Sequence, residues 1–144
     1  MNAKEYLNQA YRLEQRVQSK LAQIEALRSM AANFSLAVDR EPVSHTRNHT
    51  AMQDTVLRIL EAEQELNDEI DALVDMKREI KQTIDQVEDI TLRLVLEKRD
   101  ICFEKWEKIA LDMFYSLRSV QEKHREAVRA VQEILDAGAR EDER

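Results

Sequence analysis

The 144-residue sequence contains one glycine, one proline and one cysteine, and aromatic residues make up only 5% of it. Strands are joined by turns, and turns use Gly, Pro or Asn at special backbone dihedrals. A chain this poor in Gly and Pro cannot punctuate a sandwich, a barrel or a doubly wound sheet. The composition therefore predicts an all-α fold.

The scarcity of glycine also excludes several classes of enzyme. The motifs GxxxxGK[ST], GxGxxG and GxSxG all need closely spaced glycines, and Gly138 stands alone. Cys102 alone can form neither an internal disulfide nor a thiolate zinc site. His45 and His49 have a spacing that suits a metal on a helix, but no third ligand accompanies them and their segment is typical of a loop. We predict no catalytic residues, no metal and no cofactor.

Long hydrophobic runs are missing as well. The aliphatic clusters, such as residues 94–96, are far shorter than the roughly 20 residues of a membrane span. The first residues contain no apolar run like that of a signal peptide. We therefore expect a cytoplasmic protein that does not contact a membrane.

Charge is distributed unevenly along the chain, whose net charge is −7. Residues 51–88 contain four basic and eleven acidic side chains, whereas residues 89–135 contain nine of each. A strongly acidic chain does not coat nucleic acid nonspecifically, but a neutral module can still carry a basic face. The distribution separates an acidic segment, residues 51–88, from a balanced one, residues 89–135.

Two segments within residues 1–88 show the heptad pattern of a coiled coil. The segment between them, about residues 33–49, contains the single proline and a cluster of Ser, Thr, Asn and His, so we expect a loop there. Thr50 and Gln53 form a capping-box pattern, which predicts a second helix beginning near Met52. The heptad positions are Tyr6, Ala10, Leu13, Val17, Lys20, Ile24, Leu27 and Ala31 in the first segment, and Met52, Val56, Ile59, Glu63, Leu66, Ile70, Leu73, Lys77, Ile80, Ile84 and Val87 in the second.

These segments predict a long antiparallel helical hairpin over residues 1–88. A register that pairs Leu27 with Val56 also places Lys20 opposite Glu63, so that two polar seam residues neutralise each other. Four apolar residues lie at the heptad position next to the seam and widen the apolar stripe on one flank. Either the C-terminal module or a second copy of the chain must cover that flank, and we expect a homo-oligomer. The flanking residues are Leu7, Leu21, Leu60 and Val74.

Residues 89–135 predict a small helix-turn-helix module. Asp89 can cap its first helix, and four aromatic residues indicate a compact core: Phe103, Trp106, Phe114 and Tyr115. Residues 106–113 form an amphipathic helix in which Ala110 permits close approach of a partner helix. Ser116 is a good N-cap for a second helix, which carries Val120, Ala127, Val128 and Val131 inward. We assign Cys102 to the core, His124 to a satisfied inner position, and residues 136–144 to an acidic tail.

Residues 93–131 resemble region 4 of sigma factors. The likeness rests on an Arg-rich first helix, the pattern Trp106-x-x-Ile109-Ala110-x-x-Met113, the serine cap and the valines that follow. Over nearly its full length the chain also resembles a family of phage and prophage proteins from Gram-positive bacteria, described as sigma-like or late-operon transcription regulators. The segments YLNQAYRLEQR, EPVSHTRNHTAMQDT and FEKWEKIALDMFYS carry that likeness. It implies a location in the cytoplasm of a bacterial host cell.

The resemblance implies a reader of double-stranded DNA, in which the start of the second helix enters the major groove. Arg118 is the candidate for a bidentate guanine contact, and Gln121 could read adenine. The remaining positions on the groove side are Leu117, Ser119 and Glu122. The candidates for phosphate contacts are Lys105, Lys108, Lys123 and Arg125.

The sequence departs from the family pattern at three positions. Phe114 stands where relatives have Gly, Asn or a similar polar residue, and a bulky side chain there costs about 1 kcal/mol if the backbone is left-handed. Glu122 occupies a groove-side position where relatives have Arg, so it either reads a cytosine amino group or lowers DNA affinity. Asp100 replaces a Tyr of the relatives.

Two functions from different classes follow from these patterns. The first is a phage-type transcription regulator, whose helix-turn-helix binds promoter DNA while the coiled coil serves self-association or contact with RNA polymerase. The alternative is a protein-interaction module or inhibitor that binds a host protein such as RNA polymerase without binding DNA. Glu122 and the even charge of the module favour the alternative.

Overall fold

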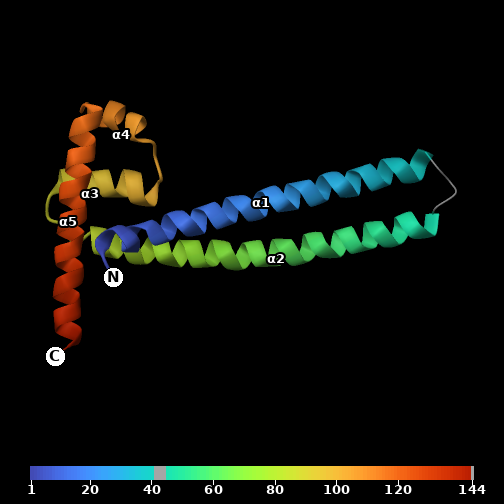
Figure 1. Cartoon of the computed structure of the whole chain (residues 1–144), viewed down its shortest axis with the longest axis horizontal. Coiled ribbons are helices and arrows are strands. Elements are labelled where there is room, and N and C mark those ends of the chain that lie inside the picture. The colour runs from blue at the N-terminus through green and yellow to red at the C-terminus, as the bar shows by residue number, and fades with distance from the viewer. Residues whose placement is uncertain (41–44, 144) are drawn as a thin grey trace. The chain divides into compact units, whose positions relative to one another are not determined.

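The computed structural model describes the backbone of residues 1–40 and 45–143, and the side chains of residues 1–34 and 49–143. Over these residues the chain is helical and contains no strand, which confirms the all-α prediction. The elements are α1 (Ala3–Arg40), α2 (His45–Ile84), α3 (Ile90–Leu96), the π-helical segment η2 (Glu97–Ile101), α4 (Trp106–Met113) and α5 (Leu117–Asp142) (Figure 1).

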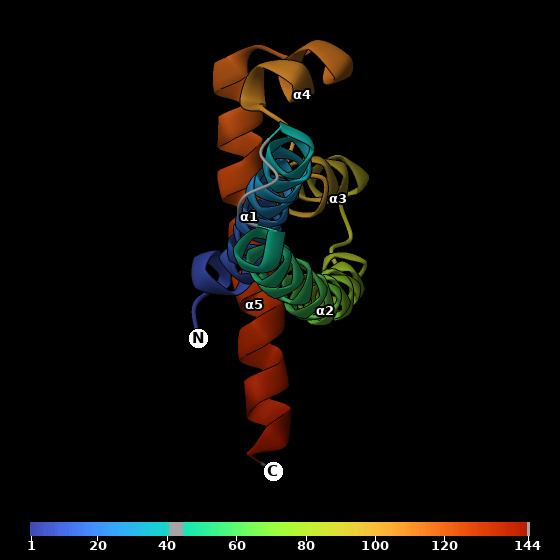
Figure 2. The same cartoon turned by 90° about the vertical axis from the view of Figure 1, so that its right-hand side faces the viewer.

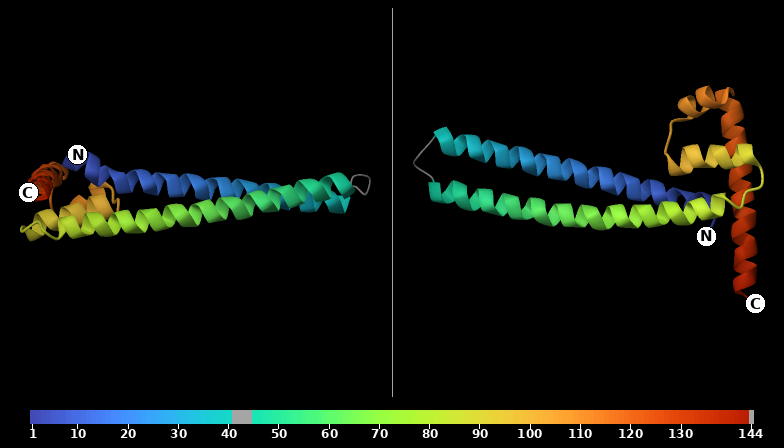
Figure 3. Two further views of the ribbon diagram at one scale, coloured as in Figure 1. Left: turned by 90° about the horizontal axis from the view of Figure 1, so that it is seen from below. Right: turned by 180° about the vertical axis from the view of Figure 1, so that it is seen from behind.

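Helices α1 and α2 pack side by side in opposite directions as the predicted helical hairpin (Figure 3). The predicted loop at 33–49 is too long, because α1 continues to Arg40 and α2 already begins at His45. No glycine or proline occurs between residue 33 and Pro42, so nothing in that stretch stops a helix. The capping-box pattern at Thr50 lies inside α2. Pro42 lies outside the described residues, as do the side chains of His45, Arg47 and Asn48.

The chain forms two compact units, one made of residues 1–13 and 73–144 and the other of residues 14–72. The division therefore falls within the hairpin helices, whereas the sequence predicted a boundary at residue 88. The first unit includes the start of α1 because the backbone N–H of Ala3 donates to Gln132 Oε1 of α5 at 2.7 Å. Tyr6 also joins this unit through its hydroxyl, 2.9 Å from Thr83 Oγ1, and burial raises its pKa.

In residues 14–72 the apolar seam is buried at Val17, Ile24 and Leu66. Near the tip Thr55 occupies the buried position, where its hydroxyl donates to the Ala51 carbonyl at 2.8 Å, and Val56 is exposed. Both 55 and 56 continue a heptad series, so the pattern alone does not fix which of them faces α1.

The predicted pair between Lys20 and Glu63 is wrong. Lys20 Nζ contacts Glu65 Oε2 at 2.5 Å, and Glu63 Oε1 accepts from Arg28 at 2.5 Å. Arg16 contacts Glu69 Oε1 at 3.1 Å. The long basic side chains of α1 reach carboxylates beside their expected seam partners, because a flexible stem lets the charged head leave the seam.

The fully buried residues of the other unit come from each of its α-helices, whereas the segment η2 contains none. Of the four flanking apolar residues, Leu7 is covered there, whereas Leu21, Leu60 and Val74 are exposed. Helix α3 packs on α5, as does α4, so α5 is shared by the whole C-terminal module. This helix extends to Asp142, and the predicted acidic tail at 136–144 is therefore helical over most of its length. The core includes Ala10, Ile80, Ile84, Val95, Leu96, Ile109, Val120, Ala127 and Val131.

An elbow separates α2 from α3, where the chain turns before entering the C-terminal helices (Figure 2). The carboxylate of Asp89 accepts from the backbone N–H groups of Thr91 and Leu92, which confirms it as the cap of α3. The Arg93 guanidinium donates to the Val87 carbonyl through Nε at 3.1 Å and through NH2 at 2.9 Å. These bonds hold the elbow and leave no continuous helix between the hairpin and the module.

None of the helices in the described part of the chain is long and apolar enough to cross a membrane.

Replacement of Ile80 by Ala should lower the free energy of unfolding by about 2–5 kcal/mol, because its fully buried side chain leaves a cavity. Leu60→Ala, at an exposed position of the same helix, should change it by less than about 0.5 kcal/mol. Urea unfolding followed by circular dichroism measures both. Equal losses for the two variants would contradict the assigned core.

Candidate nucleic-acid interface

Helices α4 and α5 pack as the predicted helix-turn-helix. Ile109, Ala110 and Val120 form a buried cluster, against which Trp106 and Met113 pack. The small side chain of Ala110 lets the two helices approach, as the sequence predicted. The backbone N–H of Tyr115 donates to the Ala110 carbonyl at 3.0 Å and closes the turn.

The turn places Phe114 in the left-handed region, with φ 59° and ψ 35°. Its side chain is 95% exposed, so the prediction that it belongs to the aromatic core is wrong. A left-handed C-cap points its side chain away from the helix it ends, which explains the exposure. Ser116 is confirmed as the N-cap of α5, because its Oγ accepts from the backbone N–H of Ser119 at 3.1 Å.

Three of the five groove-side candidates, Leu117, Arg118 and Glu122, are exposed on the first two turns of α5. Arg118 has an 89% exposed side chain, and its Nε donates to Glu122 Oε1 at 3.3 Å. Leu117 is also exposed, and Gln121 is half-buried. Ser119 instead belongs to the cap, since its Oγ accepts from Ser116 Oγ at 3.0 Å. Arg118, the candidate for the guanine contact, is thus paired with Glu122, the acid that departs from the family pattern.

The phosphate-contact candidates differ in how free they are. Lys108 bridges Glu104 Oε1 at 3.0 Å and Asp112 Oδ2 at 3.1 Å, and these hydrogen bonds raise the pKa of its ammonium group. The same lysine lowers the pKa of Asp112. Lys123 lies 5.7 Å from the centre of the Tyr115 ring. The exposed cations Lys105 and Arg125 have no ion pair among the described residues.

Other charged residues of the module have internal roles that the sequence did not reveal. Arg99 stacks 4.2 Å from the Trp106 ring centre and donates to the Glu104 carbonyl at 2.9 Å. His124 Nε2 lies 2.8 Å from Asp100 Oδ2, so His124 is satisfied as predicted, and Asp100 is its partner. The only hint of this pair in the sequence is that Asp100 stands where the relatives have Tyr.

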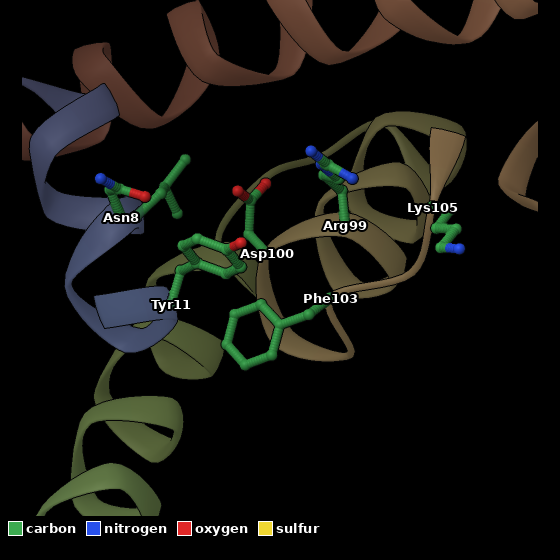
Figure 4. Close-up of a pocket in the computed structure, with 7 residues that line it drawn as sticks. Asn8, Tyr11, Arg99, Asp100, Phe103 and Lys105 are labelled. Carbon is green, nitrogen blue, oxygen red and sulfur yellow. The ribbon is translucent and has the colours of Figure 1, made fainter. Parts of the chain in front are cut away.

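A pocket of about 380 Å³ lies between the start of α1 and the η2 segment (Figure 4). Tyr11 meets Phe103 edge to face, with ring centres 5.6 Å apart. Phe103 has φ 55°, and Lys77 Nζ lies 4.8 Å from its ring centre. Of its charged groups, Arg99 and Asp100 have partners inside the protein, whereas Lys105 has no ion pair among the described residues. Its lining is Leu7, Asn8, Tyr11, Arg99, Asp100, Phe103 and Lys105.

The described residues include His49 and Cys102, the remaining candidates for metal or thiol chemistry. No group of three His, Cys, Asp or Glu side chains there is placed to hold a metal ion. His49 lies on α2, so the expectation of a loop at this position was wrong. Cys102 is exposed at the end of the π-helical segment, so its assignment to the core is wrong.

Comparison with protein-family models, with curated proteins and with solved structures gives no match to this chain.

Phe114→Gly should raise the free energy of unfolding by about 0.5–1 kcal/mol, since glycine adopts the left-handed turn without strain. Phe114→Ala should give no such gain, because alanine keeps the strain and the lost ring is exposed. Thermal unfolding followed by circular dichroism compares the two variants. A destabilised glycine variant would show that the ring contributes to folding.

Proposed function

We propose that the chain is a DNA-binding transcription regulator that is not an enzyme, in which α5 enters the major groove of double-stranded DNA. The supporting observation is the packed helix-turn-helix with an exposed arginine, Arg118, on the first turn of its second helix. This is the position from which such modules contact base edges. The resemblance to sigma region 4 supports the same proposal.

Recognition then depends on a few side chains of α5. Arg118 has a planar pair of donors that matches the O6 and N7 acceptors of guanine, and Gln121 can bond an adenine edge. Glu122 holds the guanidinium at 3.3 Å in the free protein. On DNA, Glu122 either accepts a hydrogen bond from a cytosine amino group or separates from Arg118. The ion pair therefore contributes to the choice of DNA sequence.

The electrostatic contribution to binding is modest. Residues 105–129 contain six basic and four acidic side chains, a net charge of +2. Lys108 is bonded to two carboxylates, whereas Lys105 and Arg125 are exposed for phosphate contacts. Affinity should therefore fall with salt less steeply than for a strongly basic DNA-binding protein.

The alternative is that the helix-turn-helix binds a host protein such as RNA polymerase and no DNA. One observation favours it: Leu111, Phe114 and Leu117 are exposed around the turn. Apolar side chains on an exposed surface are typical of protein interfaces. Salt separates the two functions, since an apolar contact hardly responds to it and a phosphate contact does.

Arg118→Ala should lower affinity for the preferred DNA sequence about 10- to 100-fold and abolish the preference for it, because a bidentate guanine contact is lost. The measurement is fluorescence anisotropy with genomic fragments from the source organism at two salt concentrations. Arg140→Ala, at an exposed position near the end of α5, is the matched control and should bind normally. Unchanged preference in Arg118→Ala would show that another surface reads the sequence.

Glu122→Gln should raise affinity for DNA in general about 3- to 10-fold, because it removes a negative charge near phosphates and frees Arg118. The same titration measures it, with Glu126→Gln as the control for charge alone. If Glu122→Gln weakens binding to one sequence only, Glu122 reads a base directly.

A further inference from the structure

The middle of the hairpin carries an uncovered apolar row on α2, which Gln64 and Asn67 interrupt between Leu60 and Ile70. Leu57 and Leu60 are both 56% exposed, Val56 is 44% exposed and Ile70 is 37% exposed. Positions 56, 60 and 70 each directly follow a residue on the side of α2 that faces α1, so the row lies beside the buried seam. Leu21 of α1, 44% exposed, has the same offset and adds to this face.

The carboxylates of α2 that face α1 are already neutralised. Arg16, Lys20 and Arg28 contact Glu69, Glu65 and Glu63 at 2.5–3.1 Å. These three are all of the basic residues in the stretch 14–34 of α1. Within residues 14–34 the first helix therefore has no cation left for other acids.

A second set of carboxylates on α2 has no ion pair among the described residues. Asp54, Glu61 and Asp68 recur every seven residues, and Asp71 lies closer to the apolar row. Arg58 is the single basic residue between positions 51 and 72. The apolar row is thus bordered by carboxylates that no basic side chain in the described part of the hairpin pairs with.

We propose that this face of residues 14–72 binds a basic amphipathic helix from a partner protein. Such a helix would cover the row from Val56 to Ile70 with its apolar side and place Lys or Arg beside Asp68 and Asp71. A second copy of the chain fits poorly, because its α2 would bring the same carboxylates together and its residues 14–34 offer no spare cation. Nucleic acid is repelled by the same acids. The proposal is independent of what the helix-turn-helix binds.

The test uses the full chain and a fluorescein-labelled synthetic peptide of about three heptads, with Leu at the a and d positions and Lys at the flanking positions. Fluorescence anisotropy should show saturable binding, which the double variant Leu57→Gln/Leu60→Gln weakens at least 10-fold, a conservative bound for two lost apolar contacts. Asp68→Asn/Asp71→Asn should weaken binding and reduce its dependence on salt. Ile90→Gln, at an exposed position of α3, is the matched control and should bind normally.

Several outcomes would overturn the proposal. These are absence of binding to the Lys-flanked peptide, equal binding of a Glu-flanked peptide, or equal binding of a scrambled Lys-rich peptide with no apolar side. Sedimentation of the free protein decides about a second copy: a dimer that Leu57→Gln/Leu60→Gln dissociates would assign this face to self-association. Since both leucines are exposed, circular dichroism should show unchanged helicity in the variants.

Discussion

The buried side of α5 is the constraint on which the arrangement of residues 1–13 and 73–144 depends. Val120, Ala127 and Val131 are completely buried, and both α3 and α4 pack on this helix. The start of α1 is bonded to it through Ala3 and Gln132. Because α4 must lie against Val120, the chain has only residues 114–116 in which to reverse, and the left-handed conformation of Phe114 follows from that short connection. The strain in the turn is therefore a consequence of packing elsewhere.

Local signals predicted the fold well, and long-range partners were beyond them. Asp89 and Ser116 were identified as caps because capping needs only a side chain and the next three residues. The seam near the tip was assigned one position off, since residues 55 and 56 both begin apolar series and only the packing chooses between them. The partners of Lys20 and Arg99 depend on the conformation of their long, flexible side chains. The spacing of residues along the chain does not determine that conformation. Arg118 and Glu122 lie at the start of α5, as predicted, whereas the ion pair between them was not foreseen.

Internal pairing decides which charges remain available to a partner. In the module Arg93 is bonded to the elbow, Arg99 to Trp106 and a carbonyl, and Lys108 to two carboxylates. A count of basic residues thus overstates the positive surface. In the hairpin, negative charge remains available instead. The three basic residues of residues 14–34 pair only with the carboxylates of α2 that face α1. The excess acidity of residues 51–72 lies beside exposed leucines, and this combination distinguishes a recognition face from an ordinary solvated one.

The turn of the helix-turn-helix brings two opposing features close together in the chain. Phe114 and Leu117 expose apolar surface, while Arg118 and Glu122 form a pair with no net charge. On DNA the apolar groups can contact thymine methyl groups, and the two terminal nitrogens of Arg118 can bond guanine, because its bond to Glu122 uses Nε. On a protein the apolar groups can be buried while the pair stays intact at the rim. The two functions therefore differ in what Arg118 contacts: in a DNA complex its terminal nitrogens bond a base edge, whereas in a protein complex they stay at the rim.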